Sequence, residues 1–479
     1  MSAHMKLAAF LLPTGHHAAA WRHSGSVPDA GSNFQHQLDQ AKLAERGLFD
    51  AVFIADFTSS IDEATMDGFK RMTYGASFEP ITLLSALAAT TSRIGLIGTV
   101  STTYSVPYHL ARQFLSLDQI SNGRVGWNLV TTANVRESVH YGRTSHVPHA
   151  DRYRQAREFA QIVQNFWDSW EDDAFLRDTD SGEFFSPEKR RPFQFEGEYL
   201  SASGQLDIPR SVQGRPVLVQ AGSSEAGRAL AAETAEMVFT AQQTFEDAKA
   251  FRSDLHRRMR EIGRNPETLK VMPGVYPLVG RTQAEAEDLK AELDALTHPD
   301  VGLFLLGGMT GTDLRGLPLD GPLPEVPENF NGNRSRQTLL VEMAKRRNMS
   351  LRDLYLEVSG ARGHWSIYGG PKQIADQLEE WFVEGAADGF NIMPPILPQS
   401  LETFVALVVP ELLKRGLFRQ AYEWHTLRYH LGPRCPAPGE IPLNDALFFS
   451  YQRARVFSFM HRPLGLLPLV TRSAFVFLS

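Results

Sequence analysis

Short apolar segments of strand length recur along the chain, and longer segments with helical spacing separate them. In the longer segments, apolar residues recur three and four positions apart, as on one face of a helix. The seven predicted helical segments are 36–47, 80–92, 107–121, 152–167, 225–235, 245–263 and 371–385. Alternation of this kind is typical of βα units whose strands pair in parallel. The predicted strands are Lys6–Leu12, Asp50–Ala55, Ile94–Val100, Val125–Val130, Pro216–Gln220, Met237–Thr240, Lys270–Val275 and Gly389–Met393.

Eight such alternations predict an α/β fold, and they favour a closed (β/α)8 barrel, or TIM barrel, over an open doubly wound sheet. Two helix-to-strand junctions, LAERGLFDAVFIAD and VEGAADGFNIMPP, place a glycine where the helix should end. Two segments, 171–212 and 298–365, interrupt the alternation, and the second contains two short helical patterns. We therefore expect a single barrel domain over residues 1–432 with two excursions, which usually serve as lids or as contacts between subunits.

The segment 433–479 differs in character from the rest. It begins with GPRCPAPGE and continues as an apolar and basic run without a clear period. We expect a divergent C-terminal tail that is not part of the barrel and is loosely packed.

Composition narrows the class of protein. The chain has 479 residues, of which 43% are hydrophobic and 22% charged, as in ordinary soluble globular proteins. A net charge of -7 without any Lys/Arg-rich block argues against a nucleic-acid partner. The single cysteine, Cys435, fits a cytoplasmic location. The first residues lack the features of a secretory signal, and no apolar run is long enough to span a membrane.

Polar residues recur at the same end of one predicted strand after another. Asp56 follows the second strand, Thr99 lies at the end of the third, and Asn128 and Thr132 lie at the end of the fourth. In a barrel of parallel strands these ends form one face, where active sites lie. Any one of these residues could be a helix cap or a satisfied hydroxyl. Their recurrence is what indicates a site.

The segment AGSSEAG (221–227) suits a phosphate, because a Gly–Ser–Ser turn that opens a helix offers free backbone N–H groups and the positive end of the helix dipole. The alternative is that Ser224 only caps the helix. His149 and Tyr153, four residues apart, could donate to an anion from one helix face, or could mark an exposed helix start. We predict no metal site, since the histidines of SHVPHADRY have no carboxylates at ligand spacing.

Four stretches in this order resemble a known family: GRVGWNLVTT, YGRTSHVPHADRY, VQAGSSEAG and VFTAQQTFEDAKAF. They are similar to the nitrilotriacetate monooxygenase and dibenzothiophene-sulfone monooxygenase branch of the bacterial-luciferase-like flavin monooxygenases. The resemblance covers roughly residues 6 to 432. It implies a two-component enzyme that uses reduced FMN, supplied by a separate NAD(P)H:flavin reductase, and dioxygen. The substrate it implies is a small xenobiotic, aminopolycarboxylate or organosulfur compound.

The resemblance also implies the residues of the site. Those that match positions lining the flavin pocket, or holding the flavin phosphate and its chain, are Asp56, Thr99, Thr132, His149, Tyr153, Ser223 and Ser224. Thr132 stands where the family usually has a serine. His16, after the first strand, is predicted to face the substrate and Asn128 to shape the pocket floor, as the two catalytic candidates.

Other interpretations stay open at this point. A deazaflavin-dependent oxidoreductase could use the same barrel, and a non-catalytic flavin-binding protein could keep the pocket without turnover. His16, His17, Arg22 and His23 form a basic stretch that could suit a substrate carboxylate. By resemblance we expect a homodimer or homotetramer.

Overall fold

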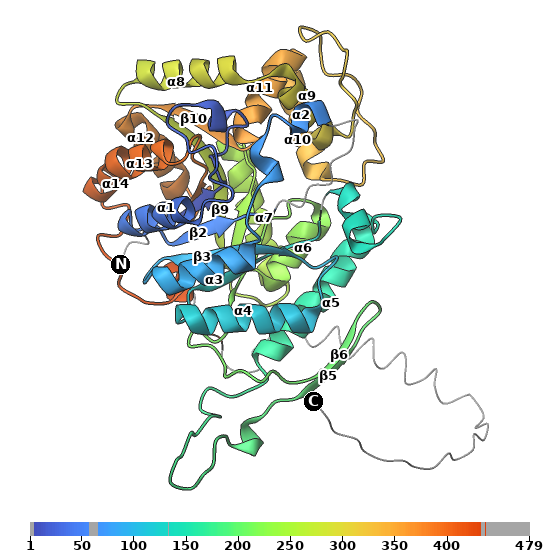
Figure 1. The fold of residues 1–479 in the computed structure, drawn as a ribbon, viewed down its shortest axis with the longest axis vertical. Helices are drawn as coiled ribbons and strands as arrows, with labels where there is room; N and C mark the ends of the chain where they lie inside the picture. The colour runs from blue at the N-terminus through green and yellow to red at the C-terminus, as the bar shows by residue number, and fades with distance from the viewer. Residues whose placement is uncertain (1–3, 57–65, 133, 433–435, 437–479) are drawn as a thin grey trace, which may run out of the picture. The chain divides into compact units, whose positions relative to one another are not determined.

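The computed structural model describes residues 4–56, 66–132, 134–432 and 436, which all belong to one unit spanning residues 1–440 (Figure 1). The predicted tail, 433–479, lies outside the described residues except for Pro436. Within the described residues, no helix is long and apolar enough to cross a bilayer.

Eight parallel strands close into the predicted barrel. They are β1 (Lys6–Leu11), β2 (Ala51–Ile54), β3 (Gly95–Ser101), β4 (Val125–Val130), β7 (Val217–Gln220), β8 (Met237–Thr240), β9 (Lys270–Val279) and β11 (Gly389–Ile392). Each pairs with its neighbours in the order β11-β1-β2-β3-β4-β7-β8, and β9 closes the ring by pairing with both β8 and β11. The (β/α)8 barrel predicted from the sequence is confirmed.

Helices cover the outside of the barrel, and each of the seven helical segments predicted between strands is a helix. These are α1 (Phe34–Arg46), α3 (Pro80–Thr90), α4 (Pro107–Ser121), α5 (His149–Trp167), α6 (Glu225–Thr234), α7 (Phe245–Glu261) and α12 (Pro371–Val383). The helices not predicted between strands are α2 (Met66–Phe69), α8 (Gln283–Leu296), α13 (Gln399–Thr403), α14 (Val409–Lys414) and α15 (Leu427–Leu431).

The strands divide their side chains between two apolar layers. Trp127 of β4 is fully buried in the layer between the strands and the helices, where its ring meets Phe159 of α5 with centroids 5.9 Å apart. Phe53 of β2 and Phe239 of β8 point into the barrel, with ring centroids 5.4 Å apart. The apolar part of GRVGWNLVTT therefore packs in the core and leaves the end of β4 to carry polar groups.

The strand β9 is longer than predicted, because a partner from outside the barrel pairs with its second half. The short strand β10 (Trp365–Gly369) runs parallel to it, in register from Trp365 opposite Val275 to Gly369 opposite Val279. The sequence prediction ended β9 at Val275 and did not include β10. The apolar run YPLV continues the strand beyond the barrel rim.

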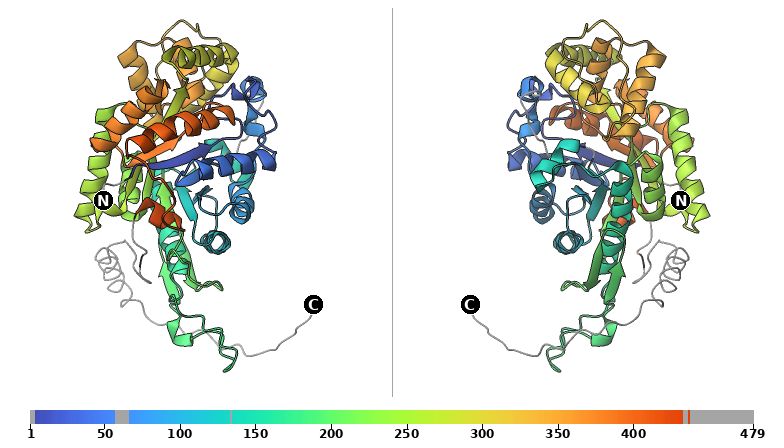
Figure 2. Two further views of the ribbon diagram at one scale, coloured as in Figure 1. Left: turned by 90° about the vertical axis from the view of Figure 1, so that its left-hand side faces the viewer. Right: turned by 90° about the vertical axis from the view of Figure 1, so that its right-hand side faces the viewer.

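The two excursions have their own secondary structure. Residues 171–212 include an antiparallel hairpin of β5 (Phe193–Glu196) and β6 (Ser201–Gly204). Residues 298–365 contain three helices, α9 (Pro299–Thr310), α10 (Arg334–Arg347) and α11 (Leu351–Ala361), where two short ones were predicted. Figure 2 shows the hairpin, in green, and the yellow-to-orange helices at opposite ends of the unit.

Candidate active site

A cavity of about 1020 Å³ opens at the carboxyl ends of the barrel strands. All seven residues predicted to bind the cofactor line it: Asp56, Thr99, Thr132, His149, Tyr153, Ser223 and Ser224. They come from the ends of four different strands and the start of α5, so the barrel brings together residues that are up to 168 positions apart in the chain, from 56 to 224. Their individual roles stay predictions.

One corner of the cavity is the turn from β7 into α6. Ser224 is the N-cap of α6, and its Oγ accepts a hydrogen bond from the Gly227 N–H at 3.2 Å. A Cβ at Gly222 would come within 3.0 Å of the Tyr153 hydroxyl and 2.9 Å of the Gly227 Cα. The two glycines of AGSSEAG therefore let the turn fold tightly onto the helix start beside Tyr153. A helix N-terminus with adjacent hydroxyls is suited to a phosphate.

The first turn of α5 faces the same corner. The rings of His149 and Tyr153 lie 4.9 Å apart, as expected for positions four apart on one helix face. Partial burial, followed by the Arg152 and Arg334 guanidinium groups, lowers the pKa of His149. At neutral pH this imidazole is therefore uncharged, and it can contribute a hydrogen bond rather than an ion pair.

The rim beside β4 is built around Thr132. This residue has a left-handed backbone, with φ 46°, which is unusual for a β-branched side chain. Its hydroxyl is hydrogen-bonded to Ser101 Oγ, and its carbonyl accepts from Arg152 Nη1. Thr132 stands where the family usually has a serine, and its hydroxyl still links the end of β4 to Ser101 at the end of β3.

Asp56 is the one carboxylate among the predicted cofactor residues that line the cavity. It follows β2, and its side chain is exposed to the cavity. Desolvation by the surrounding protein, followed by the nearby Glu79 carboxylate, raises the pKa of Asp56 to about 6. Asp56 therefore changes its protonation state close to neutral pH, which is a property of groups that exchange protons in active sites.

The two catalytic candidates line neither this cavity nor the smaller one described below. Asn128 is buried beneath the mouth and donates to Thr99 Oγ1 at 2.9 Å. His16 is fully buried, with Nε2 2.9 Å from the Phe10 carbonyl and Nδ1 3.2 Å from Arg362 Nη1. A carbonyl can only accept, so Nε2 carries the proton and Nδ1 accepts from the guanidinium. The structure places His16 as a support for Arg362, and its role toward a substrate stays a prediction.

Arg152, Arg336 and His364 are among the residues of the cavity that were not sequence candidates. Arg152 is 1% exposed and donates to the Asn331 carbonyl at 2.9 Å, so it ties α5 to the 298–365 segment. Arg336 donates to His364 Nε2 at 3.0 Å. Arg152 lies between His149 and Tyr153 in SHVPHADRY, and both of these were sequence candidates, so its neighbours indicated it. Arg336 and His364 had no such signal, because they reach the mouth from an excursion.

Among the described residues no cluster of three or more His, Cys, Asp or Glu side chains is arranged to hold a metal ion. The polar groups that line the mouth are hydroxyls, imidazoles, guanidinium groups and carboxyls, among them Asp56 with its raised pKa. A closed parallel barrel whose polar mouth lies at the carboxyl ends of its strands is typical of TIM-barrel enzymes, which bind their ligands at this face.

Within that class, the chain belongs to the luciferase-like monooxygenase family, whose model matches residues 10–389. It is 48% identical over 434 residues to N-acetyl-S-(2-succino)cysteine monooxygenase of Bacillus subtilis (strain 168), covering 90% of this chain and 97% of the relative. It is 47% identical over 435 residues to nitrilotriacetate monooxygenase component A of Aminobacter aminovorans, covering 89% and 96%. The predicted resemblance and the prediction of a monooxygenase are confirmed.

A solved structure adds information about the cofactor. The crystal structure of riboflavin lyase with modified FMN and riboflavin has a TM-score of 0.79 and 27% identity, and the match covers 92% of this chain and 98% of that one. This similarity supports a flavin as the cofactor.

Proposed function

We propose that the chain is the oxygenating component of a two-component flavin monooxygenase. It takes up reduced FMN from a separate NAD(P)H:flavin reductase and uses dioxygen to oxidise a small organic substrate. The observation that carries this proposal is the convergence of seven predicted cofactor residues on one cavity with a phosphate-suited corner. The name of the Aminobacter relative, component A, implies a second component there and supports a reductase partner here.

The residues present fit FMN. Ser223, Ser224 and the N-terminus of α6 would hold the phosphate, and Tyr153 and His149 at the start of α5 would donate to it. The hydroxyls of Thr99 and Thr132 and the carboxyl of Asp56 lie along the rim, where they can hydrogen-bond the polar edge of a flavin ring. When bound, the reduced flavin supplies the electrons with which dioxygen delivers one atom to the substrate.

The protein's own residues keep the mouth ordered and limit its access to water. Arg152 holds Asn331 and thereby fixes a segment that lines the cavity. Phe239 presents an apolar ring to the same cavity, backed by Phe10 and Phe53 in the barrel. An apolar wall beside fixed polar groups favours oxygen transfer over competing reactions with water.

The substrate belongs to the xenobiotic, aminopolycarboxylate or organosulfur compounds. Of these, the carboxylates are favoured, because both curated relatives above are named for substrates that carry several carboxylates. By resemblance we also propose a cytoplasmic enzyme that assembles as a homodimer or homotetramer.

A direct assay tests this function. The purified protein is mixed anaerobically with photochemically reduced FMN and then with ¹⁸O₂. Nitrilotriacetate, N-acetyl-S-(2-succino)cysteine and dibenzothiophene sulfone are present in parallel reactions. We expect tight binding of reduced FMN and one ¹⁸O atom in the oxidised product of at least one substrate, read by mass spectrometry. Protein that binds no reduced FMN contradicts the proposal. Binding without any labelled product favours a flavin-binding protein, and binding of reduced deazaflavin in preference to FMN favours the oxidoreductase.

A further inference from the structure

The predicted cofactor residues account for only half of the barrel mouth. They lie at the ends of β2, β3, β4 and β7, which are consecutive in the ring, or at the start of α5. The other four strands, β8, β9, β11 and β1, carry none of them. A substrate that meets the flavin must bind beside it, so this second half is where groups that recognise the substrate belong.

Arg336 of α10 reaches the cofactor cavity over β8. It donates from Nη2 to His364 Nε2 at 3.0 Å, and the His364 ring stacks on Phe239 of β8 with centroids 4.9 Å apart. All three side chains line the cofactor cavity. Because a guanidinium only donates, Nε2 of His364 accepts and its Nδ1 carries the proton. Arg336 therefore lies on the side of the mouth without predicted cofactor residues.

A strained turn holds this guanidinium. Arg362 and Gly363, which follow α11, both have left-handed backbones, with φ 51° and 80°, and the Arg362 carbonyl accepts from Arg336 Nη1. A Cβ at Gly363 would lie 3.1 Å from Arg336 Nη1, closer than ordinary contact, so the glycine lets the guanidinium lie on the turn. A left-handed backbone is unfavourable for arginine, and strain of this kind is common at functional sites. The turn thus gives Arg336 a fixed place in the cavity wall.

The positive charge of Arg336 is not neutralised by the protein. Both of its hydrogen-bond partners are uncharged, since burial, followed by the Arg336 guanidinium, lowers the pKa of His364 well below its usual value. Among the described residues no carboxylate lies within ion-pair distance of Arg336. Burial, followed by the Arg362 guanidinium, lowers the pKa of Arg336 to about 10, so it stays charged at neutral pH. A desolvated cation without a counter-charge is unfavourable unless a ligand supplies an anion.

The other arginines of α10 that line the cofactor cavity are more exposed. Arg334 lies near His149, whose pKa its charge helps to lower, and it is exposed. Arg346 is also exposed, and it donates to Gln243 Oε1 at 3.2 Å. Charges in contact with water are screened and attract an anion weakly. Arg336 is the least exposed of the three, so an anion gains most from pairing with it.

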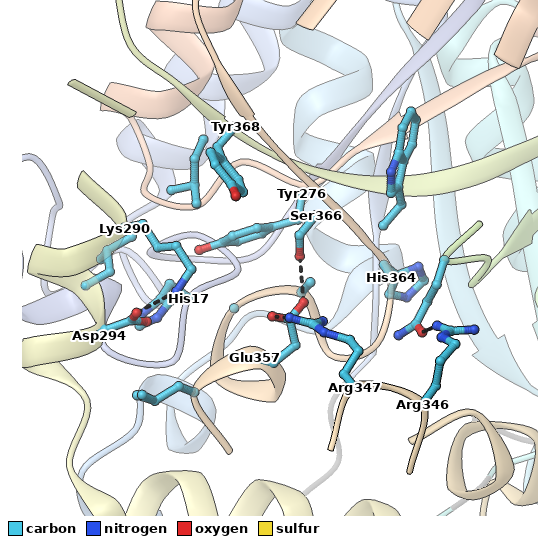
Figure 3. Close-up of a pocket in the computed structure, with 17 residues that line it drawn as sticks. His17, Tyr276, Lys290, Asp294, Arg346, Arg347, Glu357, His364, Ser366 and Tyr368 are labelled. Atoms are coloured by element: carbon cyan, nitrogen blue, oxygen red, sulfur yellow. Dashed lines mark hydrogen bonds and ion pairs between the residues drawn. The ribbon is translucent and has the colours of Figure 1, made fainter. Parts of the chain in front are cut away.

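A second cavity, of about 340 Å³, adjoins the cofactor cavity at His364, which lines both (Figure 3). Its cations differ from the one described above. Lys290 is paired with Asp294 at 2.6 Å, and Arg347 lies 3.7 Å from Glu357. These two cations have counter-charges within the protein and do not need an anionic ligand.

We propose that Arg336 binds a carboxylate of the substrate and so determines specificity for carboxylate-bearing substrates. A guanidinium matches a carboxylate because its N–H groups can donate to both oxygens. His364 and the Arg362 carbonyl hold the guanidinium in place without neutralising it. This assignment rests on the proposed function, in which the favoured substrates carry several carboxylates.

Calorimetric titration of the full chain saturated with reduced FMN, in the absence of dioxygen, tests the assignment. The probes are N-acetyl-S-(2-succino)cysteine and nitrilotriacetate, each a tricarboxylate, and their trimethyl esters, which lack the carboxylates. We expect at least one acid to bind and its ester to bind at least tenfold more weakly. Arg336→Gln should weaken binding of that acid about tenfold or more, while binding of FMN and of the ester is unchanged.

Leu339→Glu tests the charge of Arg336 without removing the guanidinium. Leu339 lines the cofactor cavity, and a Cβ at Gly363 would lie 2.9 Å from Leu339 Cδ2 and 3.1 Å from Arg336 Nη1, so the two side chains meet over this glycine. A glutamate at position 339 can therefore pair with Arg336 and compete with the acid, whose affinity should fall about tenfold. Leu339→Gln has the same length as the glutamate without its charge, and it should keep the affinity within about twofold.

Arg334→Gln and Lys345→Gln are the matched controls, since each removes one positive charge from α10 and Lys345 lines neither cavity. Their affinity for the acid should equal that of the unaltered chain. The proposal is overturned if neither acid binds, if the ester binds as well as the acid, or if Arg336→Gln keeps the full affinity. Equal affinities in Leu339→Glu and Leu339→Gln also overturn it. So do equal losses of FMN and acid affinity in Arg336→Gln, which would assign Arg336 to the cofactor.

The ¹⁸O₂ assay on the same preparations separates this inference from the proposed function. Unchanged affinity of Arg336→Gln for the acid, together with labelled product from the unaltered chain, means that the carboxylate site is wrong while the monooxygenase stands. Weakened binding of the acid in Arg336→Gln and Leu339→Glu, without labelled product from any preparation, means that the site is right while the monooxygenase function is wrong.

Discussion

The side-chain amide of Asn128 donates a hydrogen bond to Thr99 Oγ1 at 2.9 Å, and Thr99 Oγ1 donates in turn to the Ile54 carbonyl at 2.9 Å. Asn128 and Thr99 face each other in the register of β4 and β3, so strand pairing alone places them side by side. The two bonds connect three neighbouring strands below the mouth. Thr99 lines the cofactor cavity, and Asn128 acts on the cavity through it.

Thr99→Val tests this connection, because valine keeps the shape of threonine and removes its hydroxyl. The change leaves the buried side-chain amide of Asn128 without its acceptor. We expect a loss of about 1–3 kcal/mol in the free energy of unfolding, measured by chemical denaturation, and weaker FMN binding. The double variant Thr99→Val/Asn128→Leu should lose less than the sum of the two single variants, because they remove the same bond. Strict additivity would show that the two side chains do not interact.

Much of the barrel and of the cofactor cavity could be predicted from the sequence, for a physical reason. Strands such as Val125–Val130 are buried on both faces and read as short apolar runs. Parallel strands in a closed barrel bring their carboxyl ends to one face, so Thr99, Thr132 and Ser224 could be expected together without any knowledge of tertiary contacts. The sequence also marks the turn from β7 into α6 as suited to a phosphate, because AGSSEAG combines a turn with a helix start.

The excursion at 298–365 could not be predicted in the same way. Its helix α9, PDVGLFLLGGMT, contains three glycines, which disfavour a helix by intrinsic propensity. Packing overrides this: a Cβ at Gly302 would lie 2.2 Å from the Tyr355 ring, so the glycine lets α9 approach α11 closely. Arg346 and His364 reach the two cavities only through that packing, and no periodicity in the sequence marks their positions.

The stability of the protein should depend on pH through Asp56. Its pKa in the folded protein is raised to about 6 from an ordinary value near 3.8, so the carboxylate form costs free energy in the folded state. Asp56→Asn should therefore raise the Tm relative to the unaltered chain at pH 8. That advantage should shrink as the pH falls through about 6 and vanish below about 4, where Asp56 is protonated in both folded and unfolded states. Paired thermal melts across this range give the difference directly.

Glu79→Gln provides the control for this pH dependence. The Glu79 carboxylate raises the pKa of Asp56, and its oxygens also accept from the Ile81 and Thr82 backbone N–H groups at the start of α3. Glutamine keeps an acceptor for this cap and removes the negative charge. The Tm difference between Glu79→Gln and Glu79→Gln/Asp56→Asn should therefore appear at a lower pH than the Tm difference between the unaltered chain and Asp56→Asn. A transition that stays at the same pH would exclude Glu79 as a cause of the shift.

Substitutions at the corner suited to a phosphate should lower the affinity for FMN but not the affinity for riboflavin, which lacks the phosphate. Ser223→Ala removes a hydroxyl whose partner, Thr240 Oγ1, still accepts from Gln242 Nε2 at 2.9 Å, so the fold is preserved. We expect FMN affinity, followed by fluorescence quenching, to fall about tenfold while riboflavin affinity stays within about twofold, since a hydrogen bond to a charged group is worth more than a neutral one. Ser224→Gly should keep most of the stability that the N-cap provides, whereas Ser224→Ala should lose about 1 kcal/mol in the free energy of unfolding. Both substitutions should lower the affinity for FMN. Equal losses for FMN and riboflavin in these variants would place the phosphate elsewhere in the cavity.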